Sequence, residues 1–319
     1  MSTPLRDRAG EYFLELQERI CAALEETDGR AAFSRDAWSR PGGGGGLTRV
    51  LAGGAVFEKG GVNTSAVHGD LPEAAARPMT VPPGPFFATG LSLVLHPLSP
   101  MVPAVHANLR YFEAGVGDAW FGGGSDLTPS YLEAEDVRHF HRTLRDACER
   151  AEPGSYAPYK RWCDTYFLIR HRGERRGVGG VFFDGLRGDL ERRFAFVRSV
   201  GDAFLDAYLP VVRRRMHEPY GERERRWQLL RRGRYAEFNL AEDRGTAFGL
   251  QTGGRTESVL MSLPPLARWD YMAEPAAGSR EAELVEVLRE PQDWLGTDGP
   301  PGGTPVGRDG RHTARPGDA

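Results

Sequence analysis

The sequence has few cysteines and no long apolar run. Its 319 residues include only Cys21, Cys148 and Cys163, which are too few and too scattered for a disulfide framework or a zinc cluster. No stretch approaches the ~20 apolar residues that cross a membrane, and residues 1–10 are polar and lack the apolar core of a signal peptide. We therefore expect a soluble, cytoplasmic protein without a membrane span.

An excess of positive charge is also missing. The 41 Lys and Arg residues face 44 Asp and Glu residues, for a net charge of −3, whereas a general nucleic-acid binder needs a basic excess that displaces counterions from phosphates. Neither G-x-x-x-x-G-K-[ST] nor a strand–G-x-G-x-x-G–helix pattern occurs, which excludes the usual nucleotide-binding motifs. We expect no nucleic-acid partner.

Lysine is rare as well. Only Lys59 and Lys160 occur, so arginine supplies the other basic residues. Codon bias explains this bias most simply, and the alternative is a demand for carboxylate recognition, which the forked guanidinium meets better than an ammonium group.

Apolar periodicity predicts a helix near each end of the chain and strands that alternate with helices in the middle. A first helix carries Phe13, Leu16, Ile20 and Leu24 on one face and stops at Asp28-Gly29. Further helices are expected after Thr128-Pro129, over about 159–170, through 196–211 and over 281–289. Strands are expected over 48–51, 56–58, 86–96, 104–112 and 120–124. The glycine run 42–46 is either a flexible linker or a backbone that approaches a neighbour closely.

The last third is predicted to contain short antiparallel hairpins. Segments 235–241, 246–251 and 256–263 are separated by glycine-containing turns. Beyond them, 11 of the 24 residues of 296–319 are Gly or Pro, so we expect a disordered tail there. Composition does not break between residues 50 and 291, which favours one domain.

Two neighbouring strands place polar side chains on one sheet face. In 104–112, His106, Asn108 and Arg110 point away from the apolar alternate positions, and Ser92 and His96 do so in 86–96. We expect His96 to pair with His106, and Ser92 with Arg110. The simplest interpretation is a solvated outer face, but imidazoles and a forked cation favour a surface that faces a ligand.

Other polar residues allow two interpretations each. His96, His106, His141 and His171 could form a metal site, yet no tight ligand spacing supports one, and structural histidines are the simpler interpretation. Asp126 and Asp243 follow turn-like sequences, so each could be a cap or a functional carboxylate. The basic cluster 231–235 indicates a local ion-pair or anion site.

Several stretches together resemble the oxygen-dependent coproporphyrinogen-III oxidase family of haem biosynthesis. In chain order they are 38–51, 56–63, 90–97, 106–112, 120–129, 160–164, 179–184, 231–246 and 253–269. The resemblance covers roughly residues 7–295. Gly185 departs from it, because a second aspartate is usual after Phe-Phe-Asp. The segment between Phe112 and Trp120 is short, and the tail after Leu295 is extra.

The resemblance implies an α+β fold: one large, mostly antiparallel sheet flanked by helices on both faces. It implies a single catalytic domain over 1–295, followed by the tail 296–319, and a homodimer formed through about 235–270. The implied reaction uses molecular oxygen to decarboxylate the ring A and B propionates of coproporphyrinogen-III to vinyls. The product is protoporphyrinogen-IX, and no organic cofactor is needed; a divalent metal is left open.

The resemblance also implies roles for individual residues. Catalytic roles fall on the proton donor His106, the pyrrole N–H acceptor Asp243, and Arg110 and Asp126. Substrate contacts are implied for Ser92, Asn108, Leu109, Arg110, Arg244, Gly253, Gly254 and Arg255, of which the arginines suit propionates. His96, His106, His141 and His171 match positions sometimes assigned to a metal. The alternatives are a non-catalytic porphyrin-binding protein and a metal-dependent oxygenase that uses these histidines.

Overall fold

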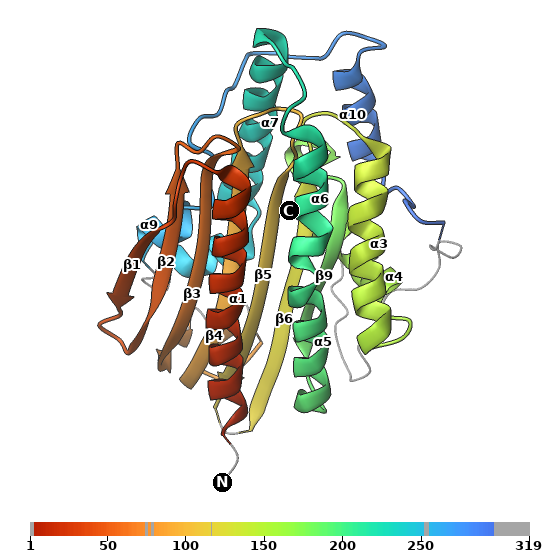
Figure 1. Cartoon of the computed structure of the whole chain (residues 1–319). Helices are drawn as coiled ribbons and strands as arrows, with labels where there is room; N and C mark the ends of the chain where they lie inside the picture. Colours follow the sequence, from red (N-terminus) through yellow and green to blue (C-terminus); the bar gives the residue numbers. More distant parts are fainter. Residues whose placement is uncertain (1–2, 74–75, 78–79, 116, 252–254, 297–319) are drawn as a thin grey trace, which may run out of the picture.

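A seven-stranded antiparallel sheet organises the molecule (Figure 1). The computed structural model describes residues 3–73, 76–77, 80–115, 117–251 and 255–296. The strands, in the order in which they lie in the sheet, are β1 (Ser34–Ser39), β2 (Gly44–Ala52), β3 (Phe57–Leu71), β4 (Gly84–Pro97), β5 (Ala104–Ala114), β6 (Asp118–Thr128) and β9 (Gly179–Leu186). A separate two-stranded ribbon consists of β7 (Leu168–Ile169) and β8 (Glu174–Arg175).

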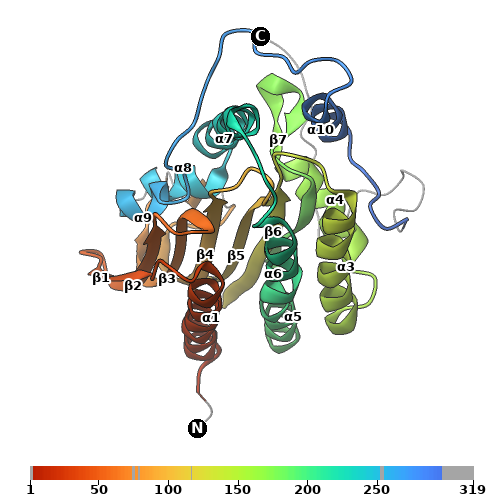
Figure 2. The same ribbon diagram turned by 45° about the horizontal axis from the view of Figure 1, so that its top comes forward.

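Helices cover both faces of the large sheet, which confirms the predicted α+β class. They are α1 (Leu5–Asp28), α3 (Ala134–Ala151), α4 (Tyr156–Tyr166), α5 (Leu190–Asp202), α6 (Phe204–Arg215), α7 (Glu222–Ala241), α8 (Arg244–Gln251), α9 (Thr256–Leu260) and α10 (Arg280–Arg289). Figure 2 shows α1, α5 and α6 on one side of the sheet and α7, α8 and α9 on the other. Within the described residues, no helix combines the length and the apolar character that a membrane crossing requires.

The hydrophobic core lies between the large sheet and the helices α1, α5 and α6. Leu91, Leu93 and Leu95 of β4 point into it together with Ile20 of α1 and Val200 of α5. This packing confirms the period-two pattern of β4 and the helical spacing of the first apolar residues. α1 ends at Gly29, whose φ of 69° is the left-handed conformation that glycine adopts without strain. At the other end, Ser279 caps α10 by accepting from the Ala282 amide.

The glycine run opens a strand and is not a linker. Gly44, Gly45 and Gly46 belong to β2, between β1 and β3. A Cβ on Gly46 would lie 2.4 Å from the Thr64 carbonyl oxygen, and one on Gly45 would lie 2.2 Å from the Trp38 carbonyl oxygen. Close approach of backbones is therefore the correct interpretation of this run.

The β4–β5 hairpin is confirmed, but its register differs from the expected one. Ser92 pairs with Asn108 and Val94 with His106, so the strands are shifted by two residues from the expected pairing of His96 with His106. A shift of two residues preserves which side chains share a face. The polar face survives, although its opposite partners change.

The expected hairpins in the last third are wrong. Segment 235–241 is the end of α7, and α8 and α9 occupy 246–251 and most of 256–263. The buried side of α7 carries Arg231, Arg232 and Asn239 beside Tyr235 and Phe238. Polar groups on the inward side conceal the helical apolar pattern on which the sequence analysis depends.

Several element boundaries also differ from expectation. Thr128 ends β6 and does not cap a helix, since α3 begins at Ala134. The helix expected through 196–211 is divided into α5 and α6 near Ala203, and α4 ends at Tyr166. The sequence analysis did not detect the exposed edge strand β1. Residues 297–319 of the expected tail 296–319 lie outside the described residues.

Candidate active site

The polar face predicted for β4 and β5 continues across β6 and β9. Pairing places Ser92 beside Asn108, His106 beside Asp126, and Arg110 beside Gly122. Asn108 also pairs with Gly124 of β6. These side chains lie on the sheet face that α7, α8 and α9 cover. Gly122 and Gly124 add no side chain to this face, which we call the floor of the site.

His106 and Asp126 form a hydrogen-bonded pair backed by an arginine. His106 Nδ1 lies 2.8 Å from Asp126 Oδ1. The Arg176 guanidinium donates to both Asp126 oxygens at 2.8 Å. The side chains of Asp126 and Arg176 are 1% and 3% exposed. Asp126 is thus a buried strand residue, and the interpretation of it as a turn or cap is wrong.

The charge of Asp126 follows from this environment. Burial opposes ionisation of Asp126, but the charge of Arg176 and the hydrogen bond from His106 outweigh it and lower the pKa of the carboxyl. An ionised carboxylate only accepts hydrogen bonds, so His106 Nδ1 carries the proton and donates. Nε2 is then the ring nitrogen that can exchange a proton with a ligand, as in other His–carboxylate pairs.

Arg110 is held in place on the same floor. Its Nη1 donates to Asn108 Oδ1 at 2.9 Å, and its Nη2 lies 2.9 Å from Asp184 Oδ2. A Cβ on Gly122 would lie 2.5 Å from Asp184 Oδ1 and 2.9 Å from Arg110 Nε, so the missing side chain makes room for this ion pair. About a third of each charged side chain is exposed. Arg110 can therefore offer its remaining N–H groups to a carboxylate ligand.

Gly185 follows Asp184. It stands where the family that the sequence resembles has a second aspartate. Its amide donates to Asp184 Oδ1 at 2.9 Å. Its φ is +60°, so the chain turns there in a left-handed conformation that suits glycine. The departure from the family pattern leaves Asp184 paired with Arg110.

Asp243 immediately precedes α8, on the helical side of the site. Its Oδ2 accepts from both the amide and the hydroxyl of Thr246 at 2.8 Å, and its Oδ1 accepts from the Tyr166 hydroxyl at 2.8 Å. Burial opposes ionisation, but the hydrogen bonds from Thr246 and Tyr166, with the charge of Arg176, lower the pKa of this carboxyl. Asp243 is both a helix cap and an ionised carboxylate within electrostatic reach of the group that holds Asp126.

An aromatic layer connects Asp243 to the sheet. Tyr166 stacks on Phe182 of β9 with ring centroids 4.1 Å apart and an interplanar angle of 13°. The Arg176 guanidinium lies over the rings of Phe167, Tyr235 and Phe238, at 4.1, 4.6 and 4.8 Å. Flat rings and a delocalised cation thus surround the carboxylates and restrict their positions.

Other predicted contact residues have different surroundings. Arg255 pairs with Asp36 of β1 at 2.6 Å, and Arg244 lies over the Tyr166 ring at 5.1 Å. The Leu109 side chain is buried in the core on the opposite sheet face, so only its backbone could contact a ligand on the polar face. Gly253 and Gly254 lie outside the described residues.

The four candidate metal histidines do not come together. His96 Nε2 donates to the Ser262 carbonyl oxygen, and burial with the charge of Arg232 lowers the pKa of His96 to about 3. His141 contacts the Tyr156 hydroxyl and the Val178 carbonyl oxygen, and burial lowers its pKa to about 3. In the part of the chain that the structure describes, no three His, Cys, Asp or Glu side chains could hold a metal ion. His96 and His141 therefore have structural roles, the simpler of the two interpretations that the sequence allowed.

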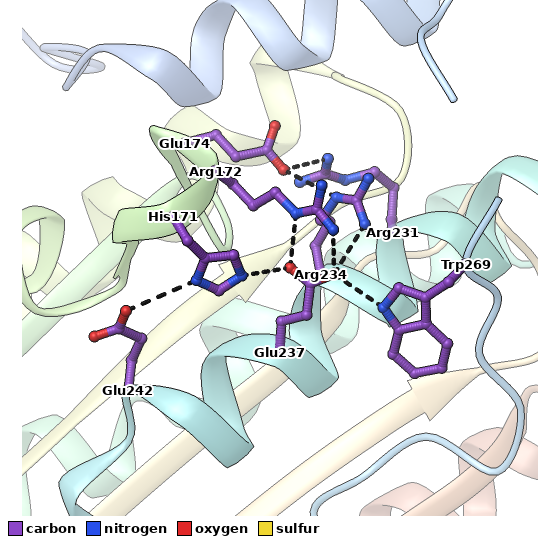
Figure 3. A network of polar contacts seen from close by, with 8 residues as sticks. All are labelled: His171, Arg172, Glu174, Arg231, Arg234, Glu237, Glu242 and Trp269. Carbon is purple, nitrogen blue, oxygen red and sulfur yellow. Dashed lines mark hydrogen bonds and ion pairs between the residues drawn. The ribbon is translucent and has the colours of Figure 1, made fainter. Parts of the chain in front are cut away.

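His171 belongs to a separate surface network centred on Glu237 (Figure 3). Glu237 accepts from His171, Arg172, Arg234 and the Trp269 indole at 2.8–3.0 Å. Burial opposes ionisation of Glu237, yet these donors lower its pKa to about 2. Arg231 pairs with Glu174 at 2.8 Å in the same network. The predicted basic cluster is therefore a local ion-pair network.

Sequence reasoning missed Arg176 and Tyr166. Arg176 lies between β8 and β9, and Tyr166 is the last residue of α4. Each is distant in sequence from the carboxylate it contacts, by 50 and 77 residues, and neither lies in a recognisable catalytic motif. Only the fold brings them to the site.

A family model provides an independent identification. The model described as coproporphyrinogen III oxidase matches residues 8–294. The match contains the polar sheet face, Arg176 and Asp243. The chain therefore belongs to the coproporphyrinogen III oxidase family, a family of oxidative decarboxylases in haem biosynthesis.

Proposed function

We propose that the protein catalyses the oxygen-dependent decarboxylation of the ring A and B propionates of coproporphyrinogen-III, giving protoporphyrinogen-IX. At each propionate, the side chain loses carbon dioxide, two electrons and one proton and becomes a vinyl, and a second proton comes from solvent. Molecular oxygen takes up two electrons and two protons and leaves as hydrogen peroxide. Oxygen is thus the oxidant, and the proposal includes no organic cofactor.

One observation carries the proposal: the ionised carboxylate of Asp243, just before α8, and the guanidinium of Arg110 on β5 both act electrostatically on the Tyr166 hydroxyl. The reduced macrocycle offers four pyrrole N–H donors, and an ionised Asp243 is a strong acceptor for them. Its propionates require cations, which Arg110 supplies. Gly122 leaves the space that the Arg110–Asp184 ion pair occupies, so Arg110 is held on the sheet face where a propionate can reach it.

The residues then have distinct tasks. Arg110 fixes a propionate through the N–H groups that Asn108 and Asp184 leave available. The charge of Asp243 stabilises positive charge that develops on the pyrrole as it loses electrons to oxygen. His106, oriented by Asp126, exchanges a proton through Nε2. Ser92, beside Asn108, supplies a further polar contact.

Turnover with and without oxygen tests the reaction. Purified protein with coproporphyrinogen-III should form protoporphyrinogen-IX in air, with one oxygen consumed and one carbon dioxide released per vinyl. In the absence of oxygen, product should not form. Binding without product under either condition would instead support the porphyrin-binding alternative, and equal turnover without oxygen would refute the proposed oxidant.

The proposal uses no metal, because the candidate histidines have separate protein partners within the described residues. Prolonged chelation followed by metal analysis tests this point. Turnover should be unchanged in metal-depleted protein. A loss that one added divalent metal restores would favour the metal-dependent oxygenase.

We also propose a homodimer that involves the segment from about 235 to 270. Support comes from exposed apolar side chains in and next to it, which are costly to leave in water: Leu240, Leu266, Trp269, Tyr271 (97% exposed) and Met272 (74% exposed). The segment 256–263, expected as a strand, supplies no exposed strand edge, because α9 covers 256–260 and Met261 is buried against Gly61. Light scattering at micromolar concentration should give twice the chain mass; a monomer mass would refute the dimer.

A further inference from the structure

The two oxygens of Asp243 are held by different parts of the chain. Thr246, three residues along, supplies both donors to Oδ2, which is ordinary helix capping. The donor to Oδ1 is the Tyr166 hydroxyl, 77 residues away on α4. Capping alone does not require this second bond, so it calls for another explanation.

The ring of Tyr166 is fixed as firmly as its hydroxyl. It stacks on Phe182 of the floor strand β9 and packs edge-on against Phe167, with centroids 5.0 Å apart. The Arg244 guanidinium lies over the same ring, 5.1 Å from its centroid. Tyr166 therefore contacts a residue of the floor strand and two adjacent residues at the start of α8: the anionic Asp243, which precedes the helix, and the cationic Arg244, which opens it.

The hydroxyl of Tyr166 remains protonated at neutral pH. Burial and the charge of Asp243 raise its pKa above the ordinary value of tyrosine. It therefore donates to Oδ1 throughout the physiological range. Because Oδ1 has two lone pairs and the described residues occupy one of them, the other can accept from a ligand.

We propose that Tyr166 is a positioning residue that sets Asp243 and Arg244 against the sheet face, so that the macrocycle meets an N–H acceptor and a propionate cation at a fixed spacing. The hydroxyl fixes the direction of the Asp243 carboxylate. The ring positions the Arg244 guanidinium through a cation–π contact. This inference rests on the proposed function, in which Asp243 and Arg244 contact the substrate.

The substitution Tyr166→Phe removes the hydroxyl and keeps the ring. We expect kcat to fall about tenfold, because one hydrogen bond to a charged group is lost from a carboxylate that acts in the transition state, while KM stays within about twofold. Tyr166→Leu also removes the aromatic ring that holds the Arg244 guanidinium. KM should therefore rise about tenfold and match the KM of Arg244→Gln. A merely structural tyrosine would change stability and both constants together.

Tyr131 offers a matched control. Its hydroxyl donates to Glu281 Oε1 at 2.8 Å, and the Arg280 guanidinium lies over its ring at 4.7 Å. Tyr131→Phe therefore removes the same type of bond beside the same type of cation at α10, and both constants should remain at the wild-type values. Thermal unfolding followed by circular dichroism verifies that each variant is folded. If Tyr166→Leu does not fold, Tyr166→Phe still decides the claim.

Asp243→Asn separates the two ways in which the test can fail. Wild-type turnover of Asp243→Asn would overturn the proposed function, and the role of Tyr166 with it. If Asp243→Asn loses turnover while Tyr166→Phe keeps the wild-type kcat, only the role of Tyr166 is overturned. The double variant should be no slower than Asp243→Asn alone, because the hydroxyl acts through the carboxylate.

Discussion

His106 donates through Nδ1 to Asp126 Oδ1 across 2.8 Å, and Arg176 holds the same carboxylate from behind. The histidine is partly exposed, whereas Asp126 and Arg176 are buried. A ligand on the sheet face can therefore reach the imidazole but not the pair that orients it. This arrangement divides the three residues into one that exchanges protons and two that support it.

Substitutions should reveal that division. His106→Gln should lower kcat strongly with little change in thermal stability, because no buried charge loses its partner. Asp126→Asn should lower both, since it leaves Arg176 buried without its counter-charge, at a cost of about 3–5 kcal/mol of unfolding free energy. Turnover and thermal unfolding of both variants provide the measurement. A stable Asp126→Asn protein would show that Arg176 does not depend on this carboxylate.

A single methyl group on the floor should disturb propionate binding. In Gly122→Ala the new Cβ would meet Asp184 Oδ1 at 2.5 Å and Arg110 Nε at 2.9 Å, so the ion pair must move. We expect a rise in KM of about tenfold or more, as for a misplaced bidentate contact, with a smaller change in kcat. Gly10→Ala is the control, because its nearest contact, at 3.6 Å, is ordinary. An unchanged KM for Gly122→Ala would show that propionate binding does not require the absence of a side chain at position 122.

Asp28 provides a pH-dependent contribution to stability away from the site. Its buried carboxylate accepts from the amides of Ala31, Ala55, Val56 and Phe57 at 2.8–3.0 Å. Burial opposes ionisation, but these amides lower the pKa below its ordinary value. Because the folded pKa lies below the unfolded pKa, the stabilisation is complete above about pH 4 and is lost as the pH falls through the folded value.

Asp28→Asn should therefore lower the unfolding free energy at pH 7 by about 1.5–3 kcal/mol or more, by the usual value of a bond to a charged group. The difference from wild type should shrink as the pH is lowered below about 4. Denaturant unfolding at several pH values measures it. Asp146→Asn, on the exposed side of α3, should change stability by less than about 0.5 kcal/mol. A pH-independent difference for Asp28→Asn would contradict the assignment of the effect to its charge.

The sequence was sufficient for the β4–β5 face but not for its register. Alternation in β5 correctly groups His106, Asn108 and Arg110, because side chains of a strand must alternate. The pairing depends on how the chain turns through residues 97–103, which no local pattern specifies. A two-residue error therefore left the face correct and its opposite partners wrong.

Residues on the helical side of the site were harder to predict. The inward side of α7 carries Arg231, Arg232 and Asn239, which bond to acceptors distant in sequence, so its apolar signal is weak. For Asp126 the sequence allows a turn residue as well as a functional carboxylate because glycines precede it, whereas β6 continues through them. Tyr166 and Arg176 owe their positions to tertiary packing alone. The family resemblance identified Asp243, but only the fold shows what holds it.

The turnover of Asp243→Asn tests the account most directly. This variant keeps the shape of the side chain but removes the charge that we propose as the acceptor of pyrrole N–H groups. Arg110→Ala is the companion variant and should mainly raise KM, because a propionate contact already exists in the ground state. For Asp243→Asn we predict a fall in kcat of about tenfold or more, with KM changed far less, since its charge acts most in the transition state. If kcat of Asp243→Asn stays near the wild-type value, Asp243 is only the cap of α8 and the proposed mechanism is wrong.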